Sequence, residues 1–231
     1  MYKLEMNQVN SNLCKNYYGK VFAHLAAVFG IASVSAEYIN ILPMVAISGS
    51  RLAGIIIQFG LLILTLVGIF YTAPGFLKYI LFIAFALLMG QSIKPLVKKL
   101  EDNNRLVRIL LITMGIFLGM TALGFYDSQN LLGFGPYLFM GLVGLILVSI
   151  LLYFVTTPAQ RKEVQINYYT DLFGTVLFTI YIAYDTQIIK EKARTCKSRL
   201  NHGVQPDYPK DSLGLFLDII NLFTYLASAN N

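Results

Sequence analysis

Apolar runs of about 20 residues recur along the whole 231-residue chain and limit its possible folds more than any other feature. A run of this length is what an α-helix needs to cross the hydrocarbon core of a bilayer. The chain is 56% hydrophobic and only 13% charged, whereas average soluble domains carry about 25% charged residues. So many long runs could not all be buried in one small soluble core. The sequence therefore predicts an all-α integral membrane protein.

Seven spans are predicted from these runs, with ends where charged residues, Gly, Pro or Asn interrupt the hydropathy. A short cytosolic segment of about residues 1–20 precedes the first span, and the chain is expected to form a single transmembrane domain. The expected spans are residues 21–42, 52–71, 77–93, 106–126, 137–155, 166–189 and 212–229. The break over residues 190–211 is basic, so it is expected to be a cytosolic loop, either against anionic lipid or simply solvated.

Charge and cysteine content narrow the partners. The formal net charge is +6, and the Lys and Arg residues lie mostly beside the apolar runs. This pattern indicates topology signals and contacts with membrane lipids, and no nucleic-acid surface is expected.

Cys14 and Cys196 have no metal-ligand spacing and fall in polar segments on one membrane side. Free thiols are expected, with a disulfide as the alternative.

Asp185 and Asp218 each lie inside a strongly apolar run. An acidic side chain at membrane depth costs about 2.5–3.5 kcal/mol on insertion scales, and it usually faces a partner, a cavity or an ion path. The two lie near the ends of consecutive antiparallel spans, so at about 1.5 Å per residue both are about 6–9 Å inside the same membrane face. We predict that they approach each other, share a proton, and when ionised offer two oxygen ligands to calcium.

Polar side chains accompany both aspartates. Tyr181 precedes Asp185 by four residues, and Asn221 and Tyr225 follow Asp218 at three and seven, so each shares the face of its aspartate. These groups could donate hydrogen bonds to the carboxylates. The alternative is that the acids and their polar neighbours only hold the helices together.

Four further ionisable residues carry weaker signals. Asp171, early in the sixth span, either complements the helix dipole or forms a second ion site. Glu37 and Asp127 are expected at the membrane interfaces. His24 is expected to be a packing histidine rather than a proton relay.

No enzyme site is apparent in the sequence. It contains no nucleophile elbow, no metal-binding cluster and no glycine-rich phosphate loop. The chain is therefore expected not to be an enzyme and to need no resident cofactor. The remaining enzymatic alternative is an intramembrane hydrolase that activates water with the two aspartates.

Four short segments resemble the Bax inhibitor-1 family, the transmembrane BAX inhibitor motif-containing proteins. Residues 178–193 (FTIYIAYDTQIIKEKA) are similar to the sixth helix of that family, and residues 215–223 (LFLDIINLF) to its seventh. Residues 90–95 (GQSIKP) resemble its Gly-x-x-x-x-Pro element, and residues 20–22 (KVF) the start of its first helix. The run from Asp185 to Ala193 points to the branch for which the family is named.

The resemblance implies a seven-helix bundle with the seventh helix central. It also implies a calcium leak of the endoplasmic reticulum membrane, gated by protons through Asp185 and Asp218. Suppression of cell death and association with Bcl-2 family proteins are expected as well. Bacterial members have an arginine at the cytosolic end of the second helix that engages the aspartates; residues 69–73 contain none, and Lys78 is the nearest cation. The alternative is a non-conducting membrane protein that acts by binding Bcl-2-type partners.

Overall fold

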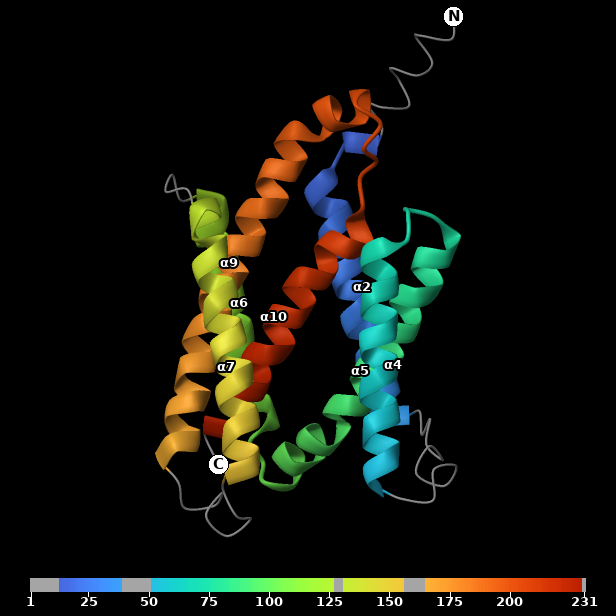
Figure 1. Ribbon diagram of the computed structural model, residues 1–231. Helices are drawn as coiled ribbons and strands as arrows, with labels where there is room; N and C mark the ends of the chain where they lie inside the picture. Colours follow the sequence, from blue (N-terminus) through green and yellow to red (C-terminus); the bar gives the residue numbers. More distant parts are fainter. Residues whose placement is uncertain (1–12, 39–50, 127–130, 156–164, 230–231) are drawn as a thin grey trace, which may run out of the picture. The chain divides into compact units, whose positions relative to one another are not determined.

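The computed structural model describes residues 13–38, 51–126, 131–155 and 165–229, and the elements in these ranges are helices (Figure 1). They are α2 (Tyr17–Tyr38), α4 (Arg51–Tyr71), α5 (Phe76–Asp102), α6 (Leu106–Tyr126), the 3-10 helix η1 (Leu131–Phe134), α7 (Gly135–Val155), α9 (Gln165–Asn201) and α10 (Tyr208–Ala229). No strand occurs within the described ranges, which confirms the all-α prediction.

Six of these helices are long and apolar enough to cross a bilayer: α2, α5, α6, η1 continued by α7, α9 and α10. The apolar stretch of α4, Ile56–Tyr71, is shorter than the 18 residues required of these six. The prediction of a multi-pass membrane protein is therefore confirmed. The count of seven spans and the central place of the last helix stay predictions. Residues 39–42 of the first predicted span lie outside the described residues.

The predicted loop over residues 190–211 is wrong for most of its length, because α9 continues to Asn201 and α10 begins at Tyr208. Lys, Glu, Ala and Arg are good helix formers, so a polar composition does not by itself end a helix. The turn comes at Gly203, whose φ of 78° lies in the left-handed region. Its N–H donates to the carbonyl of Leu200 at 2.9 Å, as in the common helix-ending turn.

Helix α5 is also longer than predicted, since it continues past Pro95 and ends at Asp102 instead of residue 93. Proline lacks the N–H that a helix interior uses, but one such loss does not stop a long apolar helix. The turn after α5 is made by Asn104, with φ of 54°, whose N–H donates to the Glu101 carbonyl at 2.9 Å.

The chain divides into two compact units. Unit 1 contains Met1–Lys99 and Lys192–Phe216, and unit 2 contains Leu100–Glu191 and Leu217–Asn231. Helices α9 and α10 therefore contribute their residues to both units. Each unit is described by itself below.

Unit 1 is held by a close approach of α2 and α5 at Gly90. A Cβ at this position would lie 2.2 Å from the carbonyl oxygen of Ala32 and 2.9 Å from the Cβ of Ser35. Polar side chains join the helices at the same level. The Ser35 hydroxyl donates to the Leu87 carbonyl at 2.7 Å, and the Gln91 amide donates to the Ser35 carbonyl at 2.5 Å. Glycine is needed at residue 90 because it lets the two backbones meet.

Unit 2 uses two similar contacts against α9. A Cβ on Gly124 of α6 would lie 2.7 Å from the carbonyl oxygen of Ala183 and from the Cβ of Thr186. A Cβ on Gly174 would lie 2.7 Å from the ring of Tyr225 on α10. Small residues thus allow close helix contacts at these positions.

Candidate functional site: a buried carboxyl pair and a polar cluster

The two predicted aspartates both belong to unit 2, Asp185 on α9 and Asp218 on α10. The Asp218 side chain is buried, at 6% exposure. Its Oδ2 atom has no hydrogen-bond partner among the described residues. Asp185 is half-buried, and its charge acts on the Asp218 carboxyl. The structure therefore brings the two carboxyls into electrostatic range, while a shared proton and calcium ligation stay predictions.

Tyr181 is the tyrosine that joins this pair. It is half-buried on α9 and lies in electrostatic range of both Asp218 and Asp185. Its ring lies 5.8 Å from that of Phe178 and 6.3 Å from that of Tyr184. These two aromatic neighbours limit the movement of the Tyr181 ring.

The other predicted polar residues do not all lie with the Asp185 and Asp218 pair. Tyr225 stacks on Phe178 at 5.8 Å and has Ser149 as its hydrogen-bond partner, in electrostatic range of Asp171. Asp171 is half-buried near the start of α9. Asn221 is half-buried one turn after Asp218. Tyr225 is thus placed with Asp171, and the expectation that it serves Asp218 is not supported by these contacts.

The residues after Asp185 anchor this part of α9. Thr186 is fully buried, packs against Gly124, and returns its hydroxyl to the Ile182 carbonyl at 2.7 Å. The Gln187 Oε1 atom accepts the N–H of Leu131, the first residue of η1, at 2.8 Å. The Asp-Thr-Gln sequence therefore has a local physical explanation. One residue presents the acid, and the next two fix the helix that carries it.

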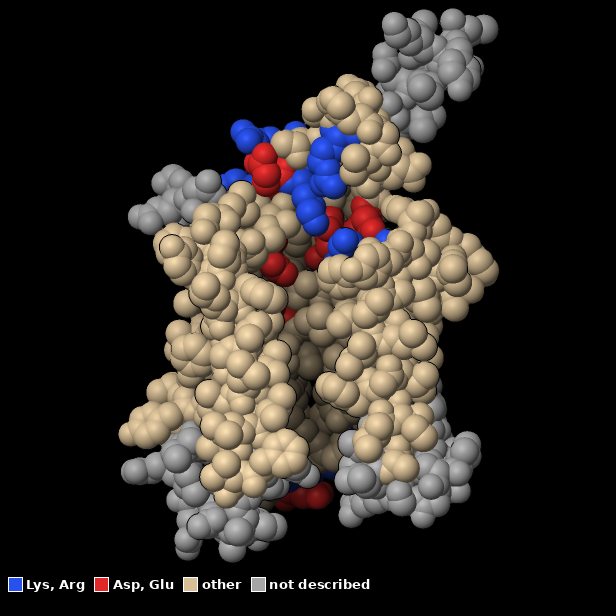
Figure 2. Space-filling view, viewed as in Figure 1, with Lys and Arg blue, Asp and Glu red and all other residues tan. Residues whose placement is uncertain are grey.

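A second polar cluster lies in unit 1, and sequence reasoning missed it. Asp211 is buried; it accepts a hydrogen bond from the Tyr17 hydroxyl at 2.5 Å and pairs with Lys192. Asp207 pairs with Lys78, a lysine that is only 1% exposed. Figure 2 shows basic and acidic side chains gathered near the top of the view, while the rest of this face shows few charged side chains apart from an acidic patch at the bottom. Both acids are neutralised locally, as buried charges require.

One sequence signal could have found this cluster. Asp207 precedes Tyr208 and Pro209, an order typical of a helix start with an N-cap acid and a proline in the first turn. The structure bears this out, because the Lys210 N–H donates to Asp207 Oδ1 at 3.3 Å. Asp211, four residues after Asp207, then shares its helix face. Lys78, the nearest cation to the missing arginine, is engaged with Asp207.

The cysteines are corrected by the structure. Cys14 and Cys196 form a disulfide, with Cα atoms 5.8 Å apart, so the expectation of free thiols is wrong. The sequence could not decide this point because 182 residues separate them. The sequence predicted that both cysteines lie on one side of the membrane, but it did not predict that they are close enough to form a bond.

Three further ionisable residues carried weaker sequence signals, and two of them, His24 and Glu37, belong to unit 1. His24 donates from Nδ1 to the Lys20 carbonyl at 2.6 Å, so its Nε2 can accept from the Tyr79 hydroxyl at 3.3 Å. These contacts match the expected packing role. Glu37 is exposed at the end of α2. Asp127 lies outside the described residues. No group of three or more His, Cys, Asp or Glu within the described ranges could hold a metal ion.

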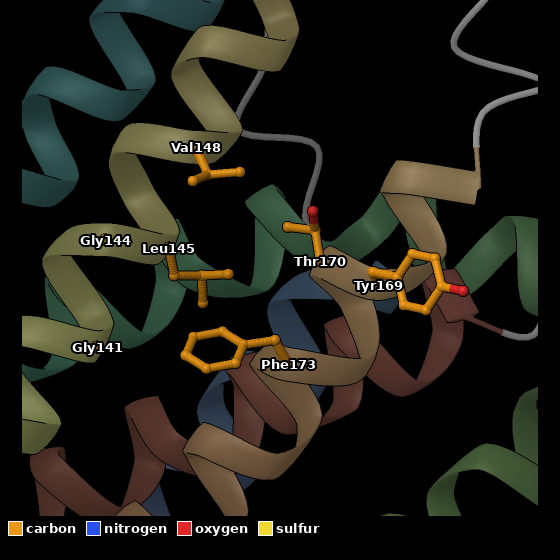
Figure 3. Close-up of a pocket in the computed structure, with 7 residues that line it drawn as sticks. All are labelled: Gly141, Gly144, Leu145, Val148, Tyr169, Thr170 and Phe173. Carbon is orange, nitrogen blue, oxygen red and sulfur yellow. The ribbon is translucent and has the colours of Figure 1, made fainter.

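An apolar cavity of about 470 Å³ lies between α7 and α9 in unit 2 (Figure 3). Its lining residues are Gly141, Gly144, Leu145, Val148, Tyr169, Thr170 and Phe173. Leu145 and Phe173 point toward one another across it. None of the predicted site residues lines this cavity, and its surface offers little to an ion.

Comparisons with known proteins agree with this architecture. A family model described as "Inhibitor of apoptosis-promoting Bax1" matches residues 14–229. An uncharacterized protein of Borreliella burgdorferi is 31% identical over 216 residues, covering 87% of this chain and 83% of that protein. Inner membrane protein YbhL of Escherichia coli K12 is 24% identical, covering 90% and 86%. Bax inhibitor 1 of Schizosaccharomyces pombe is 30% identical over 123 residues, covering 51% and 39%.

Proposed function

The chain belongs to the Bax inhibitor family, and on that premise we propose that it is a pH-sensitive calcium leak channel gated by Asp185 and Asp218. Family membership links it to membrane proteins of cell-death regulation. The calcium leak is what the family resemblance implies, and the pair of acids supports it. The observation that carries it is the buried Asp218 carboxyl, which has an unpartnered oxygen and a second acid in electrostatic range.

Two neighbouring carboxyls in a buried site cannot both be charged without an added proton or cation. When a proton is present, the pair is singly charged or neutral and its two helices can lie together. When the proton leaves, the carboxylates repel each other and present hard oxygen ligands, which calcium prefers. Tyr181, in range of both acids, can donate a hydrogen bond to either one. Proton release would thereby favour the open state.

The arginine that engages the pair in bacterial members has no counterpart at residues 69–73. Lys78 pairs with Asp207 in unit 1, so we assign it to that ion pair and not to the gate. The proposed latch of this chain therefore consists of the carboxyls, the proton they share and Tyr181.

The experiment is calcium flux from reconstituted protein. Purified chain is placed in liposomes with a calcium indicator inside, and the influx rate is measured from about pH 5 to pH 8, the window in which a buried carboxyl pair titrates. Wild type is expected to change its rate across this series, and Asp218→Asn to lose the dependence on pH. Asp185→Asn is expected to behave similarly. Glu37→Gln, which removes an exposed acid, serves as the matched control and should keep the wild-type profile.

Two outcomes count against the proposal. If Asp218→Asn keeps the wild-type profile, the proton sensor lies elsewhere, and His24 is the next residue to test. If wild type carries no flux at any pH, the second candidate function stands. That candidate is a non-conducting membrane protein that suppresses cell death by binding Bcl-2-type partners, and the family description and the name of the fission yeast relative favour it.

The membrane in which the chain acts is a separate question. We propose the endoplasmic reticulum on the family resemblance, but the relative in Escherichia coli is named as an inner membrane protein. Fractionation of native cells, with the chain detected by antibody, decides between an internal membrane and the inner membrane of a bacterial cell.

A further inference from the structure

The residues just before and at the start of α2 are tied to the polar end of unit 1 by several contacts. Residues 13–20 are called the N-terminal strap here. Cys14 of the strap is bonded to Cys196 of α9. The Tyr17 hydroxyl donates to Asp211 at 2.5 Å. Lys20 donates to the Tyr208 hydroxyl at 3.5 Å and lies 5.2 Å from the centre of that ring. The strap thus contacts both α9 and the first turn of α10.

The two sulfurs differ in accessibility. Cys14 is half-buried, whereas Cys196 is 3% exposed. Lys192 and Arg199 lie four residues before and three residues after Cys196, so they share its helix face. All three line one small cleft together with Tyr17. Neighbouring cations stabilise a thiolate, and although Lys192 also pairs with Asp211, Arg199 and Lys192 together make Cys196 the better leaving group in thiol–disulfide exchange.

We infer that Cys14–Cys196 is a redox modification site that reacts with a dithiol reductant and controls the N-terminal strap. One thiolate of the dithiol attacks Sγ of Cys14, the Cys14–Cys196 bond breaks, and Cys196 leaves as a thiolate beside Lys192 and Arg199. The second thiol of the reductant then attacks the mixed disulfide and releases Cys14. Two electrons pass to the protein, which gains two thiols, and the reductant becomes a disulfide.

The location of the bond supports a reversible role. Basic residues surround this segment, which predicts a cytosolic position. In that compartment dithiol systems keep most thiols reduced, and the disulfides that form there are usually transient or redox-sensing. A bond in such a place reports the redox state of the cell.

Reduction would act on the helix that carries the proposed sensor. Without the covalent tie, the strap keeps the Tyr17 and Lys20 contacts with the start of α10, and the hydrogen bond that the Tyr208 hydroxyl donates to the Leu13 carbonyl. Asp211, which receives the Tyr17 hydrogen bond, lies seven residues before Asp218 on the same helix. The first turns of α10 should therefore open more often when the disulfide is reduced. The effect on the leak rests on the proposed function, but the effect on the strap does not.

The test uses the full chain in liposomes at graded ratios of reduced to oxidised dithiothreitol. Alkylation and mass measurement give the fraction of Cys14–Cys196 that is reduced. Hydrogen exchange reports the strap and residues 208–214, and calcium flux is followed in parallel. Reduction is expected to speed exchange in both segments by about tenfold, the factor equivalent to losing about 1.4 kcal/mol of local stability. Exchange in α7, in the other unit, should not change.

Variants separate the bond from its neighbours. Cys196→Ser should show the fast exchange without dithiol and no response to it, which also controls for effects of the reagent on the lipid. Tyr17→Phe keeps the disulfide and removes one hydrogen bond, so it should loosen residues 208–214 while the strap stays held. If Cys14→Ser and Cys196→Ser both fail to fold, the dithiol series on wild type alone decides.

Three results would overturn the inference. The disulfide does not form in the native protein, it resists the dithiol, or it is reduced without any change in exchange. If calcium flux keeps its pH profile while the redox state changes neither hydrogen exchange nor flux, the inference is wrong and the proposed channel stands. If no flux is observed at all, the exchange data still decide the inference.

Discussion

Gly90→Ala should destabilise the protein because one methyl group must enter the contact between α2 and α5. The added Cβ would lie 2.2 Å from the Ala32 carbonyl oxygen and 2.9 Å from the Cβ of Ser35. Ordinary van der Waals contact lies at 3.4–4 Å, and the first partner is backbone, which cannot rotate away. The helices must therefore separate by about 1 Å at this level.

The magnitude follows from what separation breaks. Overpacking in a tight contact costs about 1–3 kcal/mol. The hydrogen bonds from Ser35 to Leu87 and from Gln91 to Ser35 lie at the same level, and losing both costs about 2 kcal/mol. Alanine is favoured over glycine in a helix by about 1 kcal/mol, which offsets part of this. The net loss is about 2–4 kcal/mol, or a drop of about 4–16 °C in Tm for a chain of this size.

The assay is thermal unfolding in detergent, followed by circular dichroism because the chain has no tryptophan. Gly30→Ala is the matched control, since it lies on α2 in the same unit and an added Cβ there meets nothing within 4 Å. It should leave Tm unchanged or raise it slightly. Equal Tm values for Gly90→Ala and Gly30→Ala would refute the close contact of α2 and α5 and the physical explanation of the Gly-x-x-x-x-Pro element.

Two further predictions concern buried charges. Lys78→Met should lower the free energy of unfolding by about 3 kcal/mol, the lower end of the range for breaking a buried pair, because Asp207 keeps 19% exposure. The double variant Lys78→Met with Asp207→Asn should recover most of this loss in the same unfolding assay. Additive losses from the two substitutions would contradict the ion pair. Asp218→Asn should raise Tm at pH 8 and change it little at pH 5, because only the ionised carboxyl bears the cost of burial; a lower Tm at both pH values would show that the acid stabilises the fold.

Much of the candidate site could be predicted from local sequence. The expected depth of Asp185 and Asp218 follows from counting residues along two apolar runs, and the structure places both residues in unit 2. Tyr181 follows from helical spacing. Spacing failed for Tyr225, because a shared helix face does not fix the direction of a long side chain. Its ring stacks on Phe178, beside Gly174, in contact with Ser149.

By itself the sequence determined the all-α membrane architecture, the family and the pair of acids, because hydropathy and helical period act over a few neighbouring residues. Only the tertiary structure decided which distant groups meet. The bond of Cys14 to Cys196, the pair of Lys78 with Asp207 and the hydrogen bond of Tyr17 to Asp211 join residues 182, 129 and 194 positions apart. Such contacts depend on how helices pack side by side, and no local pattern in the chain encodes that choice.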